Sequence, residues 1–314
     1  MDFALSTNWN SHRHVSGEAL VDEILSLGFD SLEVGYNYPA GLVEGLMSRL
    51  QSGAICAGSV HAFTPVPIGA PSGHPELFLM ADLDEDLRRL AVFHMRATLN
   101  FAQTVGARAV VAHAGRVPIG GYWERHSRYH AADNIDNWRY RWNRKRMLRV
   151  RQRQIDRHLN ALRRSLDVLI PEFAQAGVVL ALENLPSWDA LPHADEIRQL
   201  AVEYGRSLRC WHDIGHGQIM ENCGLCPHRE TIWQLRDLVA GTHIHDVRGA
   251  LQDHQAPGNG GIDFSGFGFL ADHHILHVLE PAPAVTAEDL KAGLLLLRQT
   301  WITAPNQSKG DGLL

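Results

Sequence analysis

The stretch Cys210-Trp211-His212-Asp213-Ile214-Gly215-His216 decides the fold that the sequence predicts. It begins as a short buried strand and ends in side chains that can bind a metal ion. Asp213 and His216 are three residues apart, across the expected strand end and the turn that follows it. Carboxylate and imidazole groups together suit Zn, Mn, Fe or Co. The fold then depends on whether other strands end in the same way and face the same place.

The stretch Thr242-His243-Ile244-His245-Asp246 repeats this pattern further along the chain. His243 and His245 are two residues apart, so in a strand their side chains point to the same side. Either imidazole is therefore a candidate ligand for a metal that Asp213 also binds.

Strand-like and helix-like runs alternate along most of the chain. Expected strands cover residues 3–6, 31–34, 55–61, 109–113, 178–183, 208–213, 241–245 and 275–280. Expected helices cover residues 16–27, 40–50, 84–105, 155–175, 194–204, 229–239 and 287–300. Eight strand units, most of them followed by a helix, predict an α/β fold of the (β/α)8 TIM barrel type. A doubly wound open sheet is disfavoured, because polar residues end strands around the whole set and not at one switch point.

One segment, residues 116–153, departs from the alternation and is expected to be an Arg/Trp-rich insertion after the fourth strand. Its part from residue 139 to residue 153 contains eight Lys or Arg and no acid. In a barrel it would lie over the active face, as a solvated helical face with a loop or as a lid or anion-binding wall. We expect a single barrel domain over residues 1–303 and a disordered tail over residues 304–314.

The composition is that of one large soluble domain. The chain has 314 residues, of which 45% are hydrophobic and 20% charged. Its net charge of -6 gives no general attraction to nucleic acid or to anionic membranes. We see neither a signal peptide nor an apolar run long enough for a bilayer, so a cytoplasmic location with reduced thiols is expected. Cys223-Gly-Leu-Cys226 is expected to be a loop with incidental thiols.

The C-terminal ends of seven of the eight expected strands, or the loops after them, carry an acid or a histidine. In a barrel these ends form one ring around the mouth. Such groups are costly to bury unless they are paired or bind a metal. We therefore predict a metal centre, with a metal-free hydrogen-bonded network as the alternative. The ring comprises Glu33, His61, His113, Glu183, Asp213, His216, His243, His245, His254 and Glu280.

The ordered set of these motifs resembles the xylose-isomerase-like TIM barrels, from about residue 3 to about residue 300. That superfamily contains sugar and sugar-phosphate isomerases and epimerases, and the apurinic-site endonucleases. The motifs are Glu33-Val-Gly, His61, His113-Ala-Gly, Leu182-Glu183-Asn184, Asp213-Ile-Gly-His216, His243-Ile-His245-Asp246, the run from Gly258 to Asp263, and Leu279-Glu280.

The resemblance implies two ligand sets. In the epimerases a single divalent metal is held by residues that correspond to Glu183, Asp213, His243 and Glu280; His243 is preferred to His245. In the endonucleases three zinc ions use additional ligands, which correspond to His61, His113, His216 and His254. Gln252 stands where that branch has an Asp, and a neutral amide is a poorer ligand, although Asp253 is adjacent. We expect one metal and leave up to three open.

The chemistry expected from this site is proton transfer beside a carbonyl. The metal, which is Mn, Zn, Co, Fe or Mg, would act as a Lewis acid and stabilise an enediolate. Glu183 and Glu280 would pass the proton, and His216 would hold the oxyanion. His245, Asp246, Arg248 and Trp211 are expected to bind substrate. Aromatic walls could come from Trp9, Tyr36, Phe63 and Trp188, for which core packing is an equal explanation.

The function predicted is therefore a divalent-metal-dependent isomerase or epimerase of a small sugar or sugar phosphate. A multinuclear zinc phosphoesterase of the apurinic-site endonuclease kind is the first alternative. A metal-dependent lyase or hydrolase acting on modified sugars is the second. The expected partner is a small carbohydrate and not nucleic acid or a membrane, and assembly into a homo-oligomer is left open.

Overall fold

The computed structural model describes residues 2–302. Eight strands pair in parallel in the order β1-β12-β9-β8-β6-β4-β3-β2, and β1 also pairs with β2, which closes the barrel. The predicted TIM barrel is confirmed, with each strand within two residues of its expected bounds. The barrel strands are β1 (Phe3–Ser6), β2 (Ser31–Val34), β3 (Cys56–His61), β4 (Ala109–Ala112), β6 (Val179–Glu183), β8 (Leu208–Asp213), β9 (Val239–Ile244) and β12 (Leu276–Leu279).

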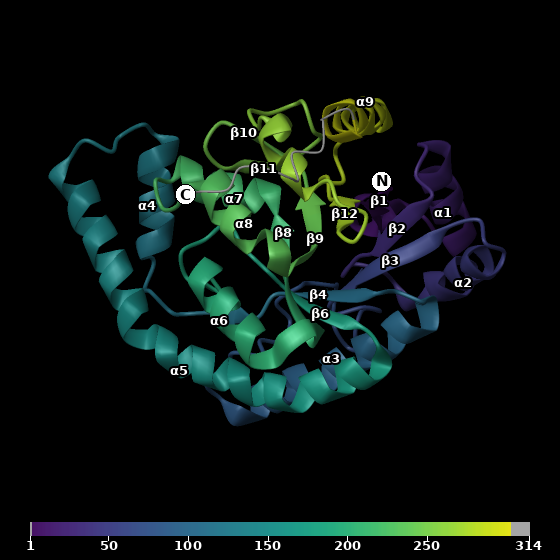
Figure 1. Cartoon of the computed structure of the whole chain (residues 1–314), viewed down its shortest axis with the longest axis horizontal. Helices are drawn as coiled ribbons and strands as arrows, with labels where there is room; N and C mark the ends of the chain where they lie inside the picture. Colours follow the sequence, from purple (N-terminus) through teal and green to yellow (C-terminus); the bar gives the residue numbers. More distant parts are fainter. Residues whose placement is uncertain (1, 303–314) are drawn as a thin grey trace, which may run out of the picture.

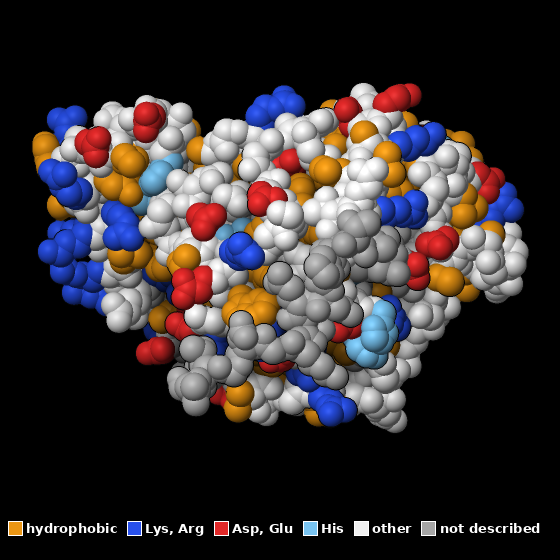
Figure 2. All heavy atoms as spheres, turned by 45° about the horizontal axis from the view of Figure 1, so that its top comes forward, with side chains coloured by type: hydrophobic (Ala, Val, Ile, Leu, Met, Phe, Trp, Pro, Cys, Tyr) orange, Lys and Arg blue, Asp and Glu red, His pale blue; other side chains and the backbone are white. Residues whose placement is uncertain are grey.

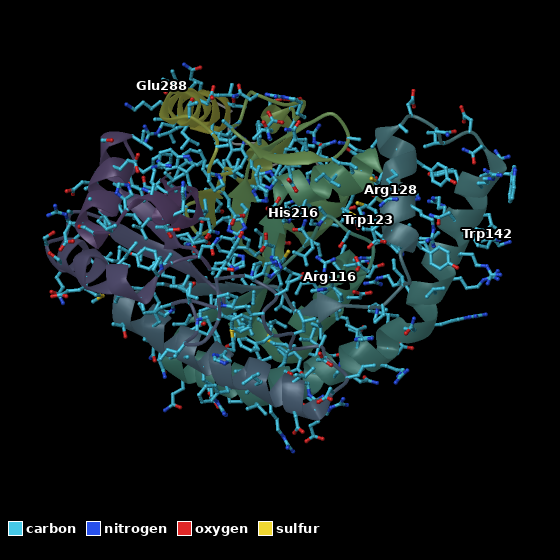
Figure 3. The ribbon with its side chains drawn as sticks, turned by 180° about the vertical axis from the view of Figure 1, so that it is seen from behind. Arg116, Trp123, Arg128, Trp142, His216 and Glu288 are labelled. Carbon is cyan, nitrogen blue, oxygen red and sulfur yellow. The ribbon has the colours of Figure 1, made fainter. Side chains whose placement is uncertain are left out.

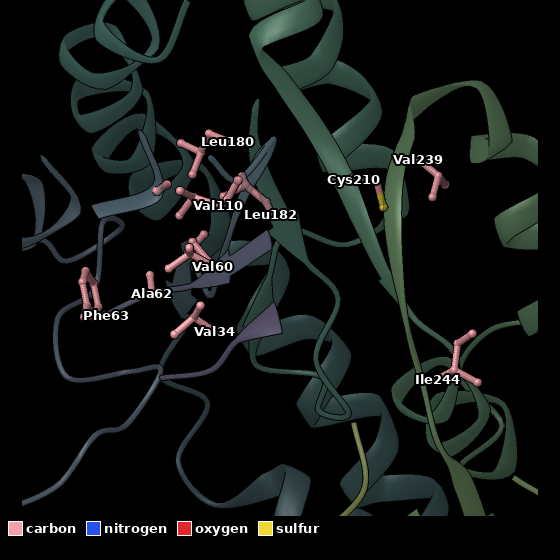
Figure 4. Close-up of a cluster of buried hydrophobic side chains, with 14 of the residues drawn as sticks. Val34, Val60, Ala62, Phe63, Val110, Leu180, Leu182, Cys210, Val239 and Ile244 are labelled. Atoms are coloured by element: carbon pink, nitrogen blue, oxygen red, sulfur yellow. The ribbon is translucent and has the colours of Figure 1, made fainter. Parts of the chain in front are cut away.

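Side chains alternate between the inside and the outside of the barrel, as the period of two in a strand requires. A small inner cluster that contains Trp211, Val111 and Val278 fills the barrel. The ring of Trp211 occupies the place where a Cβ on Gly241 would stand, 2.1 Å from the nearest ring atom, so this position needs glycine. The outward side chains pack under the helices, and Figure 4 shows part of that outer core.

Nine α-helices lie in the described part of the chain, and most of them cover the barrel (Figure 1). Side chains of Ser16, Asp84 and Thr286 cap three of these helices by accepting backbone N–H groups, which stabilises their first turns. No described helix combines the length and the apolar character that crossing a membrane requires. The helices are α1 (Gly17–Ser26), α2 (Val43–Gln51), α3 (Glu85–Val105), α4 (Tyr122–Ala131), α5 (Trp138–Ala176), α6 (Ala194–Tyr204), α7 (Ile214–Asn222), α8 (His228–Leu235) and α9 (Ala287–Leu297).

The insertion is a helical hairpin made of α4 and the first half of α5. The sequence placed the start of this helix near residue 155, which is wrong, because α5 is continuous from an Asn137 cap to Ala176. Its Arg, Gln and Leu residues favour a helix, and Pro171, which lies inside it near its C-terminal end, does not end it. The hairpin stands at one side of the molecule against α7 and α8 (Figure 1), and not as a loop across the barrel mouth. His126 contacts the Cys223 carbonyl oxygen at 3.0 Å and helps to fix it there.

The connection from β9 to β12, in which the sequence predicted neither a strand nor a helix, contains a β-hairpin. β10 (Asp246–Arg248) pairs antiparallel with β11 (Gln252–Gln255), which brings the chain back towards the barrel mouth. A second short pair joins β5 (Gly115–Arg116) to β7 (Ala190–Leu191). The predicted tail of residues 304–314 lies outside the described residues.

Candidate metal centre

The four residues predicted to hold a single metal come together at the barrel mouth. Glu183 ends β6, Asp213 ends β8, His243 lies in β9 and Glu280 follows β12. One ligand atom from each lies within 4.8 Å of the others, and all four side chains are buried. The Nδ1 atom of His243 is 2.9 Å from Glu183 Oε1, 3.3 Å from Glu280 Oε2 and 3.9 Å from Asp213 Oδ2. His243 is in this group and His245 is not.

The orientation of His243 is set by Glu33, whose role the sequence did not reveal. Glu33 oxygens lie 3.0 and 3.2 Å from His243 Nε2, so Nδ1 is the ring nitrogen that faces the other three ligands. Ser6 and Ser59 donate hydrogen bonds to the two oxygens of Glu33 and fix it in turn. A carboxylate on the far nitrogen of a ligand histidine is a common support of metal sites.

A second group of ligands shares Glu183. The Nε2 atoms of His61 and His113 both lie 3.1 Å from Glu183 Oε2. His61 Nδ1 donates to the carbonyl oxygen of Ala62, which leaves Nε2 as the ring nitrogen for a metal. His113 Nδ1 is 3.5 Å from Glu76, a carboxylate that Arg116 also binds. The structure thus brings together two histidines that a site with one metal does not need.

A third group contains His216, His245 and His254. His245 Nε2 is 3.0 Å from Asp213 Oδ1, and the rings of His245 and His254 stack with centroids 4.1 Å apart. The β10–β11 hairpin delivers His254, which donates from Nδ1 to the Glu280 carbonyl oxygen. Gln252, whose neutral side chain argued against a third metal, is exposed at the start of β11. His245, predicted to bind substrate, supplies the third imidazole of this group, and its Nδ1 accepts the His254 N–H at 2.9 Å.

The protonation of His216 argues against the oxyanion role expected for it. Its Nδ1 faces the carbonyl oxygen of Asn184 at 2.9 Å and must donate the hydrogen there. Burial lowers the pKa of His216 to about 4, so the ring is neutral and Nε2 carries a lone pair. A lone pair suits a metal and cannot donate to an oxyanion.

The charge of the centre fits a divalent cation. Glu33, Glu183, Asp213 and Glu280 are four carboxylates that are each at most 5% exposed. Burial and the Glu183 carboxylate raise the pKa of Asp213. Burial alone would raise the pKa of Glu183, but His243, His113 and His61 outweigh it and hold the pKa well below its usual range. Buried carboxylates this close together need a compensating positive charge, and oxygen and imidazole donors are what Zn, Mn or Fe prefer.

Three residues predicted to bind substrate have other surroundings. Trp211 is fully buried below His243, with ring centroids 5.2 Å apart, and supports that ring. The Asp246 carboxylate accepts hydrogen bonds from four backbone N–H groups of its own loop. Arg248 is exposed and donates to the Asn259 carbonyl oxygen. These positions hold the site or the surface together and do not point into it.

Of the four aromatic residues considered as walls of the substrate site, one lies beside the metal centre and three lie elsewhere. Tyr36 packs edge-on against His61 at 5.2 Å, and burial and the carboxylates of the centre raise its pKa. Trp9 and Phe63 are buried in the core, while Trp188 lines a separate cavity. Of the insertion, Trp123 lies on the side nearer to His216, and Trp142 lies on the outer helix (Figure 3).

Comparison of the sequence with protein families shows to which family the chain belongs. The sequence profile of the xylose isomerase-like TIM barrel family matches residues 21–274. The chain belongs to this family. The resemblance found in the strand-end motifs is thereby confirmed.

Several solved structures resemble the chain over nearly its whole length. The 3-keto-D-glucoside 4-epimerase YcjR of E. coli has a TM-score of 0.67 at 18% identity, covering 95% of this chain and 99% of that one. A D-psicose 3-epimerase has a TM-score of 0.67 at 12% identity, with coverage of 96% and 99%. The probable 3-DHS dehydratase AsbF of Bacillus anthracis has a TM-score of 0.62 at 15% identity, with coverage of 95% and 98%. At these identities the likeness establishes the fold.

A sequence relative matches only part of the chain. The uncharacterized protein MJ1614 of Methanocaldococcus jannaschii is 30% identical over 112 residues. The match covers 36% of this chain and 42% of that protein.

Proposed function

We propose that this family member is a metal-dependent isomerase or epimerase of a small sugar or sugar phosphate. The observation that carries the proposal is the meeting of Glu183 and Glu280 with Asp213 and His243 in one buried group. Two of the solved barrels that the chain resembles are named as epimerases of sugars, which agrees with it.

The two glutamates have the surroundings that proton transfer needs. Glu183 is ionised at neutral pH because His243 and the other imidazoles lower its pKa, so it can accept a proton. Glu280 is held on its other oxygen by Asn8 Nδ2 at 3.1 Å. A divalent cation in this group would supply Lewis-acid polarisation of a carbonyl. Glu183 would then remove the adjacent proton and Glu280 would return one, and in the reverse reaction Glu280 would remove the proton and Glu183 would return one.

The direct test replaces the proton acceptor and keeps its shape. Glu183→Gln should lower turnover of a responsive ketose by at least about a hundredfold, because the amide cannot take a proton. Exchange of solvent deuterium into the sugar, followed by NMR, measures the step itself. The matched control is Glu44→Gln on the exposed face of α2. Turnover near normal in Glu183→Gln with an intact fold would remove the acid–base assignment, and loss of water from the sugar would indicate a lyase.

A second candidate, a multinuclear phosphoesterase, is favoured by the three neighbouring ligand groups. Two of them share Glu183, and His245 of the third lies 3.0 Å from Asp213 Oδ1. A hydroxide between metals could then attack phosphorus. The basic face of α5 does not supply phosphate contacts at the mouth, because it lies on the outer side of the hairpin (Figures 2 and 3). Elemental analysis of the purified protein separates the two: one metal per chain favours the isomerase, and three zinc ions with cleavage of an abasic duplex favour the hydrolase.

A further inference from the structure

A cavity of about 560 Å³ lies outside the barrel, between its wall and the helices α5 to α8. Its inner wall consists of outward-facing residues of β6 and β8, namely Leu182, Cys210 and His212. The next residues along these strands, Glu183 and Asp213, face inward to the metal centre. The barrel wall therefore separates the cavity from the candidate active site.

The lining is mostly apolar and opens between α5, α6 and α8. Exposed Gln152, Arg198 and Gln234 stand at the opening, and an Arg198–Gln234 hydrogen bond of 3.4 Å crosses from α6 to α8. The volume of the cavity is in the range of binding sites for small molecules, which are typically apolar with a few placed polar groups. The deeper apolar lining includes Leu148, Ile155, Leu185, Ile197, Ile232 and Leu235.

Four polar atoms of residues that line this cavity are buried and have no hydrogen-bond partner within the described chain. They are Arg151 Nε, Trp188 Nε1, His193 Nε2 and His228 Nδ1. Three of these side chains cluster: the Arg151 guanidinium lies 5.7 Å from the Trp188 ring centre, and the Trp188 and His193 rings are 4.6 Å apart. The nitrogens of Arg151 and Trp188 can only donate. Since buried polar groups in native proteins are almost always paired, an acceptor is expected for each of these two donors.

The deep part of the cavity carries no free charge, because the charged lining residues Asp195 and Arg198 are exposed at the surface. Arg151 is neutralised by two hydrogen bonds to Glu196, of 2.6 and 3.0 Å. Burial lowers the pKa of His193 and of His228 to about 3, so both rings are neutral at physiological pH. An anion or a cation that entered would lose its hydration without gaining a counter-charge.

We propose that this cavity is a second ligand site, for an uncharged and largely apolar molecule that carries a carbonyl or hydroxyl oxygen. The oxygen would accept from Trp188 Nε1 and Arg151 Nε, and the apolar part would lie against the leucine and isoleucine lining. Ordered water is the competing occupant, because the four polar atoms could also bond to it. The proposal is independent of the proposed catalytic function.

Four probes of one shape, offered to the metal-loaded protein, test the chemistry of the site. Acetophenone is neutral and has one acceptor oxygen, benzoate is an anion, benzylamine is a cation and toluene has no acceptor. We expect acetophenone to bind, with benzoate and benzylamine at least about tenfold weaker because of uncompensated charge. Toluene should be weaker by roughly threefold or more, since it leaves the donors unpaired. Calorimetric titration measures all four affinities.

Two variants place the binding in this cavity. Trp188→Phe removes a donor and should weaken acetophenone binding by roughly threefold or more. Ile232→Trp should fill the cavity and abolish binding. The matched control is Trp233→Phe, next to Ile232 on α8, because Trp233 is 46% exposed, packs on Phe269 and is not part of the lining. The proposal is overturned if no probe binds in the millimolar range, if the charged probes bind as well as acetophenone, or if Trp188→Phe binds as the wild type does.

Discussion

Glu33 shows how much of a metal centre can depend on a residue that is not itself in the four-ligand group. It is fully buried, bonds to His243 Nε2 and is held by two serine hydroxyls. Burial alone would raise the pKa of Glu33, but His243 and His61 lower it, so the carboxylate is charged and fixes which nitrogen of His243 faces the site. Glu33, which is not a ligand itself, therefore decides which nitrogen atom of His243 can bind the metal.

We predict that Glu33→Gln weakens binding of Mn²⁺ by roughly 10- to 100-fold without unfolding the protein, because His243 loses its charged anchor. Titration of the metal-free protein with Mn²⁺ measures the affinity. Glu44→Gln serves as the surface control. An affinity equal to that of the wild type would show that the barrel positions His243 without Glu33.

At the scale of elements, Arg151 joins the long helix α5 to the opposite side of the cavity. Its guanidinium binds both oxygens of Glu196 on α6 and the carbonyl oxygen of Ala190 in β7. It is only 5% exposed, although it lies in the arginine-rich run of residues 139–153. Helical periodicity turns this one arginine inward while its neighbours face solvent.

Replacement by lysine tests this junction, because lysine keeps the charge but lacks the planar guanidinium that binds both oxygens of Glu196. We expect Arg151→Lys to lower the free energy of unfolding by about 1–3 kcal/mol. Arg153→Lys, at an exposed position two residues further on, should change it by less than about 0.5 kcal/mol. Urea unfolding gives both values, and equal values would mean that the Glu196 contacts do not stabilise the helix.

The loop that carries His254 depends in a similar way on Asp246. The Asp246 carboxylate accepts N–H groups from Val247, Gly258, Gly260 and Ile262, at 2.8 to 3.0 Å. These bonds tie residues 258–262 to the start of the β10–β11 hairpin. They so help to place His254 near His216 and His245.

Asp246→Asn puts an amide donor against those N–H groups and should destabilise the protein by about 1–3 kcal/mol. Limited proteolysis should cut the variant within residues 246–262 faster than the wild type. Asp237→Asn, at an exposed position, is the control. If both variants resist protease as the wild type does, the carboxylate is not what holds this loop.

For the molecule as a whole, buried neutral histidines link stability to pH. Burial lowers the pKa of His277 to about 4, and it lies between the rings of Phe3 and Trp301 with Nδ1 3.1 Å from the Thr242 hydroxyl. In the unfolded chain the same group titrates near pH 6.5. Between these values the unfolded state binds the extra proton, so stability is complete above pH 6.5 and falls as the pH drops towards 4.

His277→Gln should therefore flatten the dependence of stability on pH. The loss between pH 6.5 and pH 4 should be smaller in the variant by up to about 1.4 kcal/mol per pH unit, because one protonation is removed. Urea unfolding at several pH values in EDTA removes the effect of bound metal. Exposed His274, changed to Gln, is the control, and parallel curves for wild type and His277→Gln would refute the linkage.

Much of this architecture could be predicted from the sequence alone. Apolar runs of strand length, seven of them followed by an acid or a histidine, predicted the eight strands and a ring of ligand side chains at the barrel mouth. The resemblance to the family then selected Glu183, Asp213, His243 and Glu280 from that ring. This works because parallel strands in a barrel bring their carboxyl ends to one face, so position along a strand translates into position in the site.

Other features were decided only by the tertiary structure. The bond from Glu33 to His243 spans 210 residues, and the entry of His245 into the third ligand group depends on a hairpin that looked like loop. The continuous α5 and the inward turn of Arg151 were likewise hidden within a uniformly basic run. Local sequence patterns indicate burial and periodicity. The partner of a buried charge, in contrast, is the distant group that the closed barrel places within hydrogen-bonding distance.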